Sequence, residues 1–139
     1  MPRRDLRDAF REAVLLRDGG RCIVPGCGHD ATDVHHLMER RLFSDGGYLE
    51  DNGVSLCGQH HLDAERTVLA ADELRTAAGI CDTVLPSGWD PGLLYDKWGN
   101  IISSTGWRYP GPLFWEKSVQ RALREGNMLR GFDYSWQQR

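Results

Sequence analysis

Three cysteines and a histidine in the first half of the chain fall into two closely spaced pairs. Four residues separate Cys22 from Cys27, and two residues separate Cys57 from His60. Zinc binds thiolate sulfur and imidazole nitrogen readily, and two such pairs joined by a longer segment are typical of a structural tetrahedral site. We therefore predict a structural Zn site with Cys22, Cys27, Cys57 and His60 as its ligands.

Two other residues compete with His60 for the fourth position, because the spacing alone does not exclude His29 or Cys81. A different interpretation is that the thiols are free and buried and that His60 lies at the surface. Two turn-type pairs seldom arise by chance, so zinc is favoured. Binding of structural zinc is coupled to folding, with apparent energies of about 10–16 kcal/mol in zinc-finger peptides, so this site would stabilise a small domain.

Two histidine doublets, His35-His36 and His60-His61, contain four of the five histidines. Adjacent side chains on a strand point to opposite faces, so one histidine of the first doublet can bind a metal while the other faces a substrate. Adjacent residues on a helix are about 100° apart, so His60 can complete the zinc site while His61 turns toward a second ion. Glu65 lies one turn beyond His61 on the same face and is a further candidate ligand of that second ion.

The apolar pattern predicts the elements that position these residues. Apolar residues at three- and four-residue steps before Gly19-Gly20 predict an amphipathic helix over about residues 5–17. A short strand is expected near residues 33–37, and the segment VSLC leads into a loop or a second short strand. Further helices are expected over about residues 60–67, 70–79 and 113–129, the last with Trp115, Val119, Ala122 and Leu123 on one face.

The interlocked motifs over about residues 15–67 resemble those of the HNH endonucleases. The chain has a histidine doublet on an expected strand, Asn52 sixteen residues after His36, and the sequence C-x-x-H-H at Cys57–His61. His60 stands where many zinc-bearing members have a cysteine. The resemblance implies an α+β fold with a ββα-metal (HNH) core, in which two antiparallel strands and a helix enclose one catalytic divalent cation. The N-terminal helix and a Trp-rich C-terminal extension would be added to this core.

The resemblance also implies a role for each residue of the motif. His35 and His61 would bind the catalytic ion, His36 would act as the general base, and Asn52 would brace the loop between the strands. A neutral imidazole with a pKa near 6.5 is suited to accept a proton from water, and such a base contributes about 10²–10⁴-fold to a rate. Asp33 can orient a neighbouring imidazole.

The expected activity is hydrolysis of phosphodiester bonds in DNA by a metal-dependent endonuclease, with the ion acting as a Lewis acid. Arg40 and Arg41 follow the strand and are candidates for nucleic-acid binding, although paired arginines are often simply solvated. Imidazole ligands suit Zn or Ni, whereas Glu65 favours Mg or Mn, so the catalytic ion stays open. The alternative is a non-catalytic, zinc-braced nucleic-acid-binding module; it is less favoured because His36 is not needed to bind zinc.

Composition is compatible with a small soluble protein. The 139 residues are 40% hydrophobic and 27% charged, and no apolar run approaches the roughly 20 residues that a membrane span requires. The charged start is unlike a signal peptide, so we expect a cytoplasmic protein with reduced thiols. Small stand-alone HNH proteins of bacteria and phages are similar in size, so the resemblance also implies that a bacterium or a phage encodes the chain. Net charge is −3, but residues 1–21 carry +2, residues 42–107 carry −7 and residues 108–139 carry +3. The two ends can therefore supply a phosphate-binding surface.

We expect a zinc-braced HNH core with its N-terminal helix over residues 1–80 and a C-terminal extension over residues 81–139 that packs on this core. The extension contains Trp98, Trp107 and Trp115, which are expected to build a second small core. These tryptophans can alternatively help to position DNA or form the surface of a homodimer.

Overall fold

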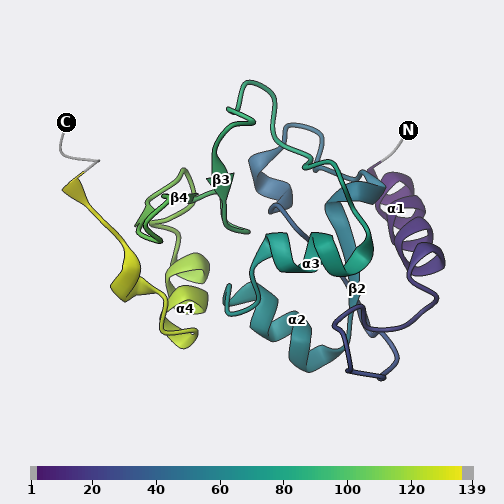
Figure 1. Cartoon of the computed structure of the whole chain (residues 1–139). Coiled ribbons are helices and arrows are strands. Elements are labelled where there is room, and N and C mark those ends of the chain that lie inside the picture. The colour runs from purple at the N-terminus through teal and green to yellow at the C-terminus, as the bar shows by residue number, and fades with distance from the viewer. Residues whose placement is uncertain (1–2, 136–139) are drawn as a thin grey trace.

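The computed structural model describes residues 3–135 as a mixed α+β structure (Figure 1). Its helices are α1 (Arg3–Arg17), α2 (Gly58–Glu65), α3 (Ala71–Ala78) and α4 (Lys117–Glu125), with short 3₁₀ helices at Arg40–Leu42, Glu50–Asn52 and Leu129–Gly131. Strands β1 (Asp33–His36) and β2 (Gly53–Leu56) form one antiparallel sheet. Strands β3 (Leu94–Tyr95), β4 (Ile101–Ile102) and β5 (Arg108–Tyr109) form a second. None of the helices in this described part is long and apolar enough to cross a membrane.

The sheet of β1 and β2 has a different helix on each face. Val54 and Leu56 lie in the main core beside residues of α2 and α3, such as Ala64 and Leu74. Gly53, which precedes Val54, lies beneath α1, where a Cβ atom would be only 2.5 Å from the Phe10 ring. The alternation of side chains along β2 therefore directs one face to α1 and the other to α2 and α3.

Helix α1 is held against this sheet by polar contacts as well as by packing. The Asp18 carboxylate, just after the helix, accepts a hydrogen bond from the backbone N–H of Ser55 at 2.9 Å. Arg17 donates to the carbonyl of Gly53 at 2.7 Å. Phe10 and Val14 are buried, so the amphipathic helix predicted over residues 5–17 is confirmed, with its start at Arg3.

The segment after β2 also follows the predicted pattern with shifted boundaries. Helix α2 begins directly after Cys57, two residues earlier than predicted, and α3 ends before Gly79, which adopts a left-handed conformation with φ of +74°. The expected strand near residues 33–37 is present as β1, and the VSLC segment contributes most of β2. The order β1, β2, α2 places both histidine doublets around one sheet and one helix.

The C-terminal part differs from the expectation in two respects. Helix α4 begins at Lys117, because residues 111–116 form turns in which the Phe114 N–H bonds to the Gly111 carbonyl. Trp115 consequently precedes the helix and is 65% exposed, and Trp107 is 51% exposed, so the predicted packing of both tryptophans in a second core is wrong. That second core is present, but it is formed by Trp98, Leu113, Phe114, Val119, Leu123 and Phe132.

Side chains of the C-terminal part bind the end of α2. The indole N–H of Trp98 donates to the carbonyl of Glu65 at 2.8 Å. Arg66 forms an ion pair with Glu125 at 3.0 Å at the end of α4. Figure 1 shows the resulting arrangement, in which α1 and α4 lie on opposite sides of the molecule with α2 and α3 between them.

Candidate metal centres and the adjoining cleft

Cys22, Cys27, Cys57 and His60 lie together, with one potential ligand atom of each within 4.8 Å of the others. The Sγ atoms of Cys22 and Cys57 lie 3.4 and 3.3 Å from Nδ1 of His60, and Sγ of Cys27 lies 3.9 Å from that of Cys57. A tetrahedral zinc site with Zn–S near 2.3 Å and Zn–N near 2.0 Å has ligand–ligand edges of about 3.5–3.8 Å. The four residues can therefore bind a metal ion such as zinc.

The other candidates for the fourth position are placed differently. His29 Nδ1 lies 3.3 Å from Sγ of Cys27, but this imidazole is outside the group of four mutually close ligand atoms. Cys81 is exposed and also lies outside that group. His60 is thus the residue that completes the cluster, while His29 contacts it from one side.

The local backbone favours the metal-binding form of Cys57. This residue immediately precedes α2, so its sulfur faces the free N–H groups of the first helical turn. A hydrogen bond from the backbone N–H of His60 lowers the pKa of the Cys57 thiol, which favours the thiolate. Burial raises the pKa of Cys22, whose thiolate would need a cation beside it to be stable.

A second cluster consists of His35, His61 and Glu65, again with ligand atoms within 4.8 Å of one another. Oε1 of Glu65 lies 3.0 Å from Nε2 of His61 and 3.7 Å from Nδ1 of His35. Nδ1 of His35 is buried and has no hydrogen-bond partner among the described residues. A buried nitrogen without a partner is unfavourable, and a cation beside it would satisfy its lone pair. The donor set therefore fits a divalent ion.

Burial and neighbouring groups keep His35 neutral and Glu65 ionised, which are the protonation states in which they could bind a cation. Burial, followed by the positive charge of Lys97, lowers the pKa of His35 to about 4, so its imidazole is neutral at pH 7. Burial raises the pKa of Glu65, but its close imidazole neighbours outweigh this effect and hold that pKa well below the usual range. The Asp33 carboxylate lies 3.5 Å from Nδ1 of His61, which directs Nε2 of that ring toward Glu65.

His36 lies on the opposite face of β1. Its ring packs against Phe10 of α1 and against Tyr48, with ring centroids 4.8 and 5.4 Å away. A hydrogen bond joins the imidazole to the backbone of Gly46, and Nε2 is buried with no partner in the described chain. This bond raises the pKa of the ring, so Gly46 accepts through its carbonyl, the nitrogen bonded to it carries the proton, and Nε2 has a free lone pair. Burial and then Lys97 outweigh this bond, lower the pKa of His36 to about 4 and keep the ring neutral at pH 7.

Asn52 braces the loop between the two strands. Its buried amide donates to the carbonyls of Met38 and Gly47, each at 3.1 Å, and its oxygen accepts from the Met38 N–H at 3.0 Å. These bonds join the residues that follow β1 to the glycine pair that lies beside His36. The position of Asn52 thus fixes the backbone that holds Gly46, the hydrogen-bond partner of His36.

An open cleft of about 480 Å³ adjoins both faces of β1, with His36, His61, Glu65, Glu39 and Lys97 in its lining. Arg7, Arg11, Arg40 and Asp8 also line this cleft, and the guanidinium groups of the three arginines form no ion pair or hydrogen bond within the part of the chain that the structure describes. Arg41 differs, because it forms ion pairs with Glu116 and Glu39. Arg7 and Arg11 are not among the residues predicted from the sequence, although their spacing of four residues places them on one face of a helix.

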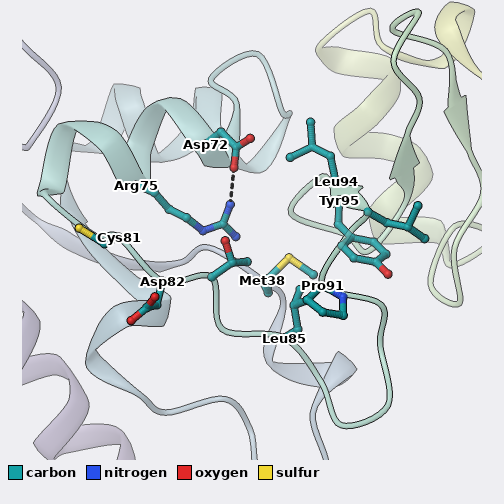
Figure 2. Close-up of a pocket in the computed structure, with 11 residues that line it drawn as sticks. Met38, Asp72, Arg75, Cys81, Asp82, Leu85, Pro91, Leu94 and Tyr95 are labelled. Carbon is teal, nitrogen blue, oxygen red and sulfur yellow. Dashed lines mark hydrogen bonds and ion pairs between the residues drawn. The ribbon is translucent and has the colours of Figure 1, made fainter.

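A smaller cavity of about 310 Å³ lies between α3 and the chain around residues 81–95 (Figure 2). The Arg75 guanidinium points toward it and binds the Asp72 carboxylate at 2.8 Å, and Met38, Leu94 and Tyr95 provide apolar wall. Its lining includes no member of either metal-binding cluster. The candidate chemistry is therefore concentrated in the larger cleft.

Comparisons of the chain with protein-family models, with curated proteins and with solved structures give no match. The function must consequently be inferred from the geometry of the two clusters and of the cleft.

We predict that protein purified without added metal contains about one zinc ion per chain, bound by the four-residue cluster. Replacement Cys57→Ala should remove this zinc and lower the melting temperature by about 10 °C or more, because folding is coupled to metal binding. Elemental analysis and thermal unfolding measure the two effects. Cys81→Ala is the matched control, since it removes an exposed thiol outside the cluster and should change neither. The structural site would be excluded if the purified parent contained no zinc and Cys57→Ala unfolded at the same temperature as the parent.

Proposed function

We propose that the protein is a metal-dependent endonuclease of the HNH type that hydrolyses phosphodiester bonds in DNA. The observation that carries this proposal is the division of the first histidine doublet between the two faces of β1. His35 lies with His61 and Glu65 in a cluster that fits a cation, whereas His36 lines the cleft with a neutral imidazole whose Nε2 has no partner among the described residues. The order of two antiparallel strands followed by a helix is also the arrangement that the resemblance implies.

His36 has the features of a general base. Its Nε2 atom is buried and has a free lone pair, which would accept a proton from a water molecule that reaches it from the cleft, while the bond to Gly46 holds the other nitrogen protonated. The rings of Phe10 and Tyr48 restrict the orientation of the imidazole, which keeps the accepting nitrogen in one place. A binding module would have no need for an imidazole held in this way.

The residues of the second cluster would hold the catalytic ion. A divalent cation bound by His35, His61 and Glu65 would supply Lewis-acid stabilisation of negative charge on the phosphate and on the leaving oxygen. Two imidazoles and one carboxylate form a mixed donor set, which suits Mn²⁺, Ni²⁺ or Zn²⁺ more than a site of oxygen ligands alone would. The zinc cluster would have a different role, because it secures the junction between β2 and α2 from which His61 and Glu65 project.

The substrate is assigned from the charge of the cleft. Arg7, Arg11 and Arg40 have no acidic partner in the described chain, so their guanidinium groups are free to bind phosphate oxygens. Binding of polyanionic DNA by such residues is driven largely by the release of counterions. The three arginines lie beside His36 in the same cleft, so a phosphodiester bound by them would be near the proposed base.

We predict that the protein cleaves supercoiled plasmid DNA only when a divalent ion is added, and that His36→Ala lowers the rate at least about 10²-fold. The variant should keep its zinc and its affinity for DNA, because His36 belongs to neither cluster, although loss of the contacts with Phe10 and Tyr48 should lower its melting temperature. Assays with Mg²⁺, Mn²⁺, Ni²⁺ and Zn²⁺, each repeated with a chelator too weak to remove the structural zinc, test both statements.

His29→Ala is the control for this experiment, because it removes an imidazole outside the cleft and should cleave like the parent. Cleavage by His36→Ala at the parental rate would refute the assignment of the base. Tight DNA binding by the parent without cleavage in any ion would instead favour the non-catalytic binding module.

We also predict that the double substitution Arg7→Ser and Arg11→Ser weakens DNA binding and makes it less dependent on salt. Removal of one phosphate-binding side chain should reduce the slope of log K against log salt concentration by about 0.9, so the pair should reduce it by about 2. Fluorescence anisotropy with a labelled duplex at several salt concentrations measures the slope. Arg121→Ser with Arg124→Ser is the matched control, because it removes the same charge from the exposed surface of α4. Equal slopes for the two double variants would exclude α1 as a DNA-binding surface.

A further inference from the structure

A lysine from the C-terminal part of the chain reaches the proposed active site. Lys97 follows β3, and its side chain is only 4% exposed. Its ammonium group donates to the His36 carbonyl at 3.2 Å, forms an ion pair with Glu39 at 3.1 Å and lies 3.8 Å from Oε2 of Glu65. The same group lies over the Trp98 ring, 4.9 Å from its centroid. Lys97 therefore contacts the strand that carries both histidines and also approaches the carboxylate of the metal-binding cluster.

The backbone that presents Lys97 is tightly held. The buried Asp96 carboxylate accepts hydrogen bonds from the N–H groups of Trp98 and Asn100 and from Arg108, which fixes the turn after β3. The Glu39 N–H donates to the Lys97 carbonyl at 3.0 Å, so main chain and side chains join the same two residues. An ammonium group on such a rigid support keeps its position when a ligand enters the cleft.

The charge of Lys97 acts on both partners that the cleft is expected to bind. The buried charge of Lys97 is tolerated because the Glu39 carboxylate neutralises it. The two side chains form a neutral pair beside the −1 charge of Glu65. The ammonium group has three N–H donors, and two acceptors lie within hydrogen-bond distance, the His36 carbonyl and Glu39. The third donor is available to Glu65 or to an anion. A positive charge at this place repels a metal cation and attracts a phosphate group.

We propose that Lys97 is a positioning residue of the catalytic site, which orients the Glu65 carboxylate and the strand that carries His36. Its positive charge also lowers the affinity of the site for the metal ion and raises its affinity for the substrate phosphate. This inference rests on the proposed function, because it assigns Lys97 to the same cleft. The proposal also gives residues 81–135 a direct part in the site, since they supply the ammonium group that balances the charge of Glu39. Glu39 has the opposite electrostatic effect, as its carboxylate would strengthen cation binding.

Two substitutions that each remove one charge separate this role from a purely structural one. Lys97→Gln removes the positive charge and leaves a neutral amide on a side chain one atom shorter, and the isosteric Glu39→Gln keeps an acceptor for Lys97 but removes the negative charge. With zinc bound in the structural cluster, isothermal titration with Ni²⁺ alone should show an affinity about tenfold or more higher for Lys97→Gln than for the parent. Glu39→Gln should bind Ni²⁺ at least about tenfold more weakly. DNA cleavage by Lys97→Gln should nevertheless fall by about tenfold or more, despite the tighter binding of the metal.

Opposite shifts in Ni²⁺ affinity are the decisive result, because disruption of the fold would weaken metal binding in both variants. The double variant Lys97→Gln with Glu39→Gln removes the pair without leaving a buried charge, so it should fold and bind Ni²⁺ close to the parental affinity. Weaker or unchanged Ni²⁺ binding by Lys97→Gln would overturn the inference, as would a parent protein that binds no Ni²⁺ at the second cluster. A parent that binds Ni²⁺ with the predicted order of affinities but cleaves no DNA would refute the proposed function and leave the electrostatic role of Lys97 established.

Discussion

Alternation of side chains along β1 is the constraint on which the proposed site depends. His35 and His36 are neighbours in sequence, but His35 pairs across the sheet with Val54 and His36 with Gly53, whose faces are covered by different helices. One imidazole therefore joins residues of α2, while the other packs against Phe10 of α1. A shift of the strand register by one residue would exchange the two environments, so the pairing of β1 with β2 sets the chemistry of both histidines.

The zinc cluster and the second cluster are linked through α2. Cys57, just before the helix, and His60 belong to the first cluster, whereas the adjacent His61 and, one turn later, Glu65 belong to the second. A helix of only eight residues has little stability of its own, so the bonds at its ends decide its position. The residues that could bind zinc lie at its start, and the Trp98 indole donates a hydrogen bond to the carbonyl of Glu65 at its end. The orientation of the proposed catalytic ligands is thus determined from both sides.

Much of the candidate site could be predicted because its members are close in sequence. The cysteine pairs, the two doublets, Glu65 and Asn52 all belong to local patterns, and the rules of strand and helix geometry indicate which members face each other. Lys97, Glu39 and the arginines of α1 could not be found in this way, because packing between distant segments brings them to the cleft. The error over Trp115 has a related cause, since hydrophobicity does not reveal which of two adjacent aromatic residues faces inward. Phe114 occupies the buried position, and Trp115 is left exposed.

The net charge of this chain is a poor guide to the charge of its binding partner, because many acidic side chains form internal ion pairs whereas some arginine side chains do not. Several acidic side chains are neutralised within the protein: Glu116 by Arg41, Asp96 by Arg108 and Glu125 by Arg66. The arginines of α1 that line the cleft have no such partners in the described residues. A chain with a formal charge of −3 can therefore present a cleft in which unpaired arginine side chains are available to an anion, although Asp8, Glu39 and Glu65 also line it. The pairs Arg41–Glu116 and Arg66–Glu125 also join the C-terminal part, which carries Lys97, to the core, so the same contacts hold this part in place and neutralise two of its acidic groups.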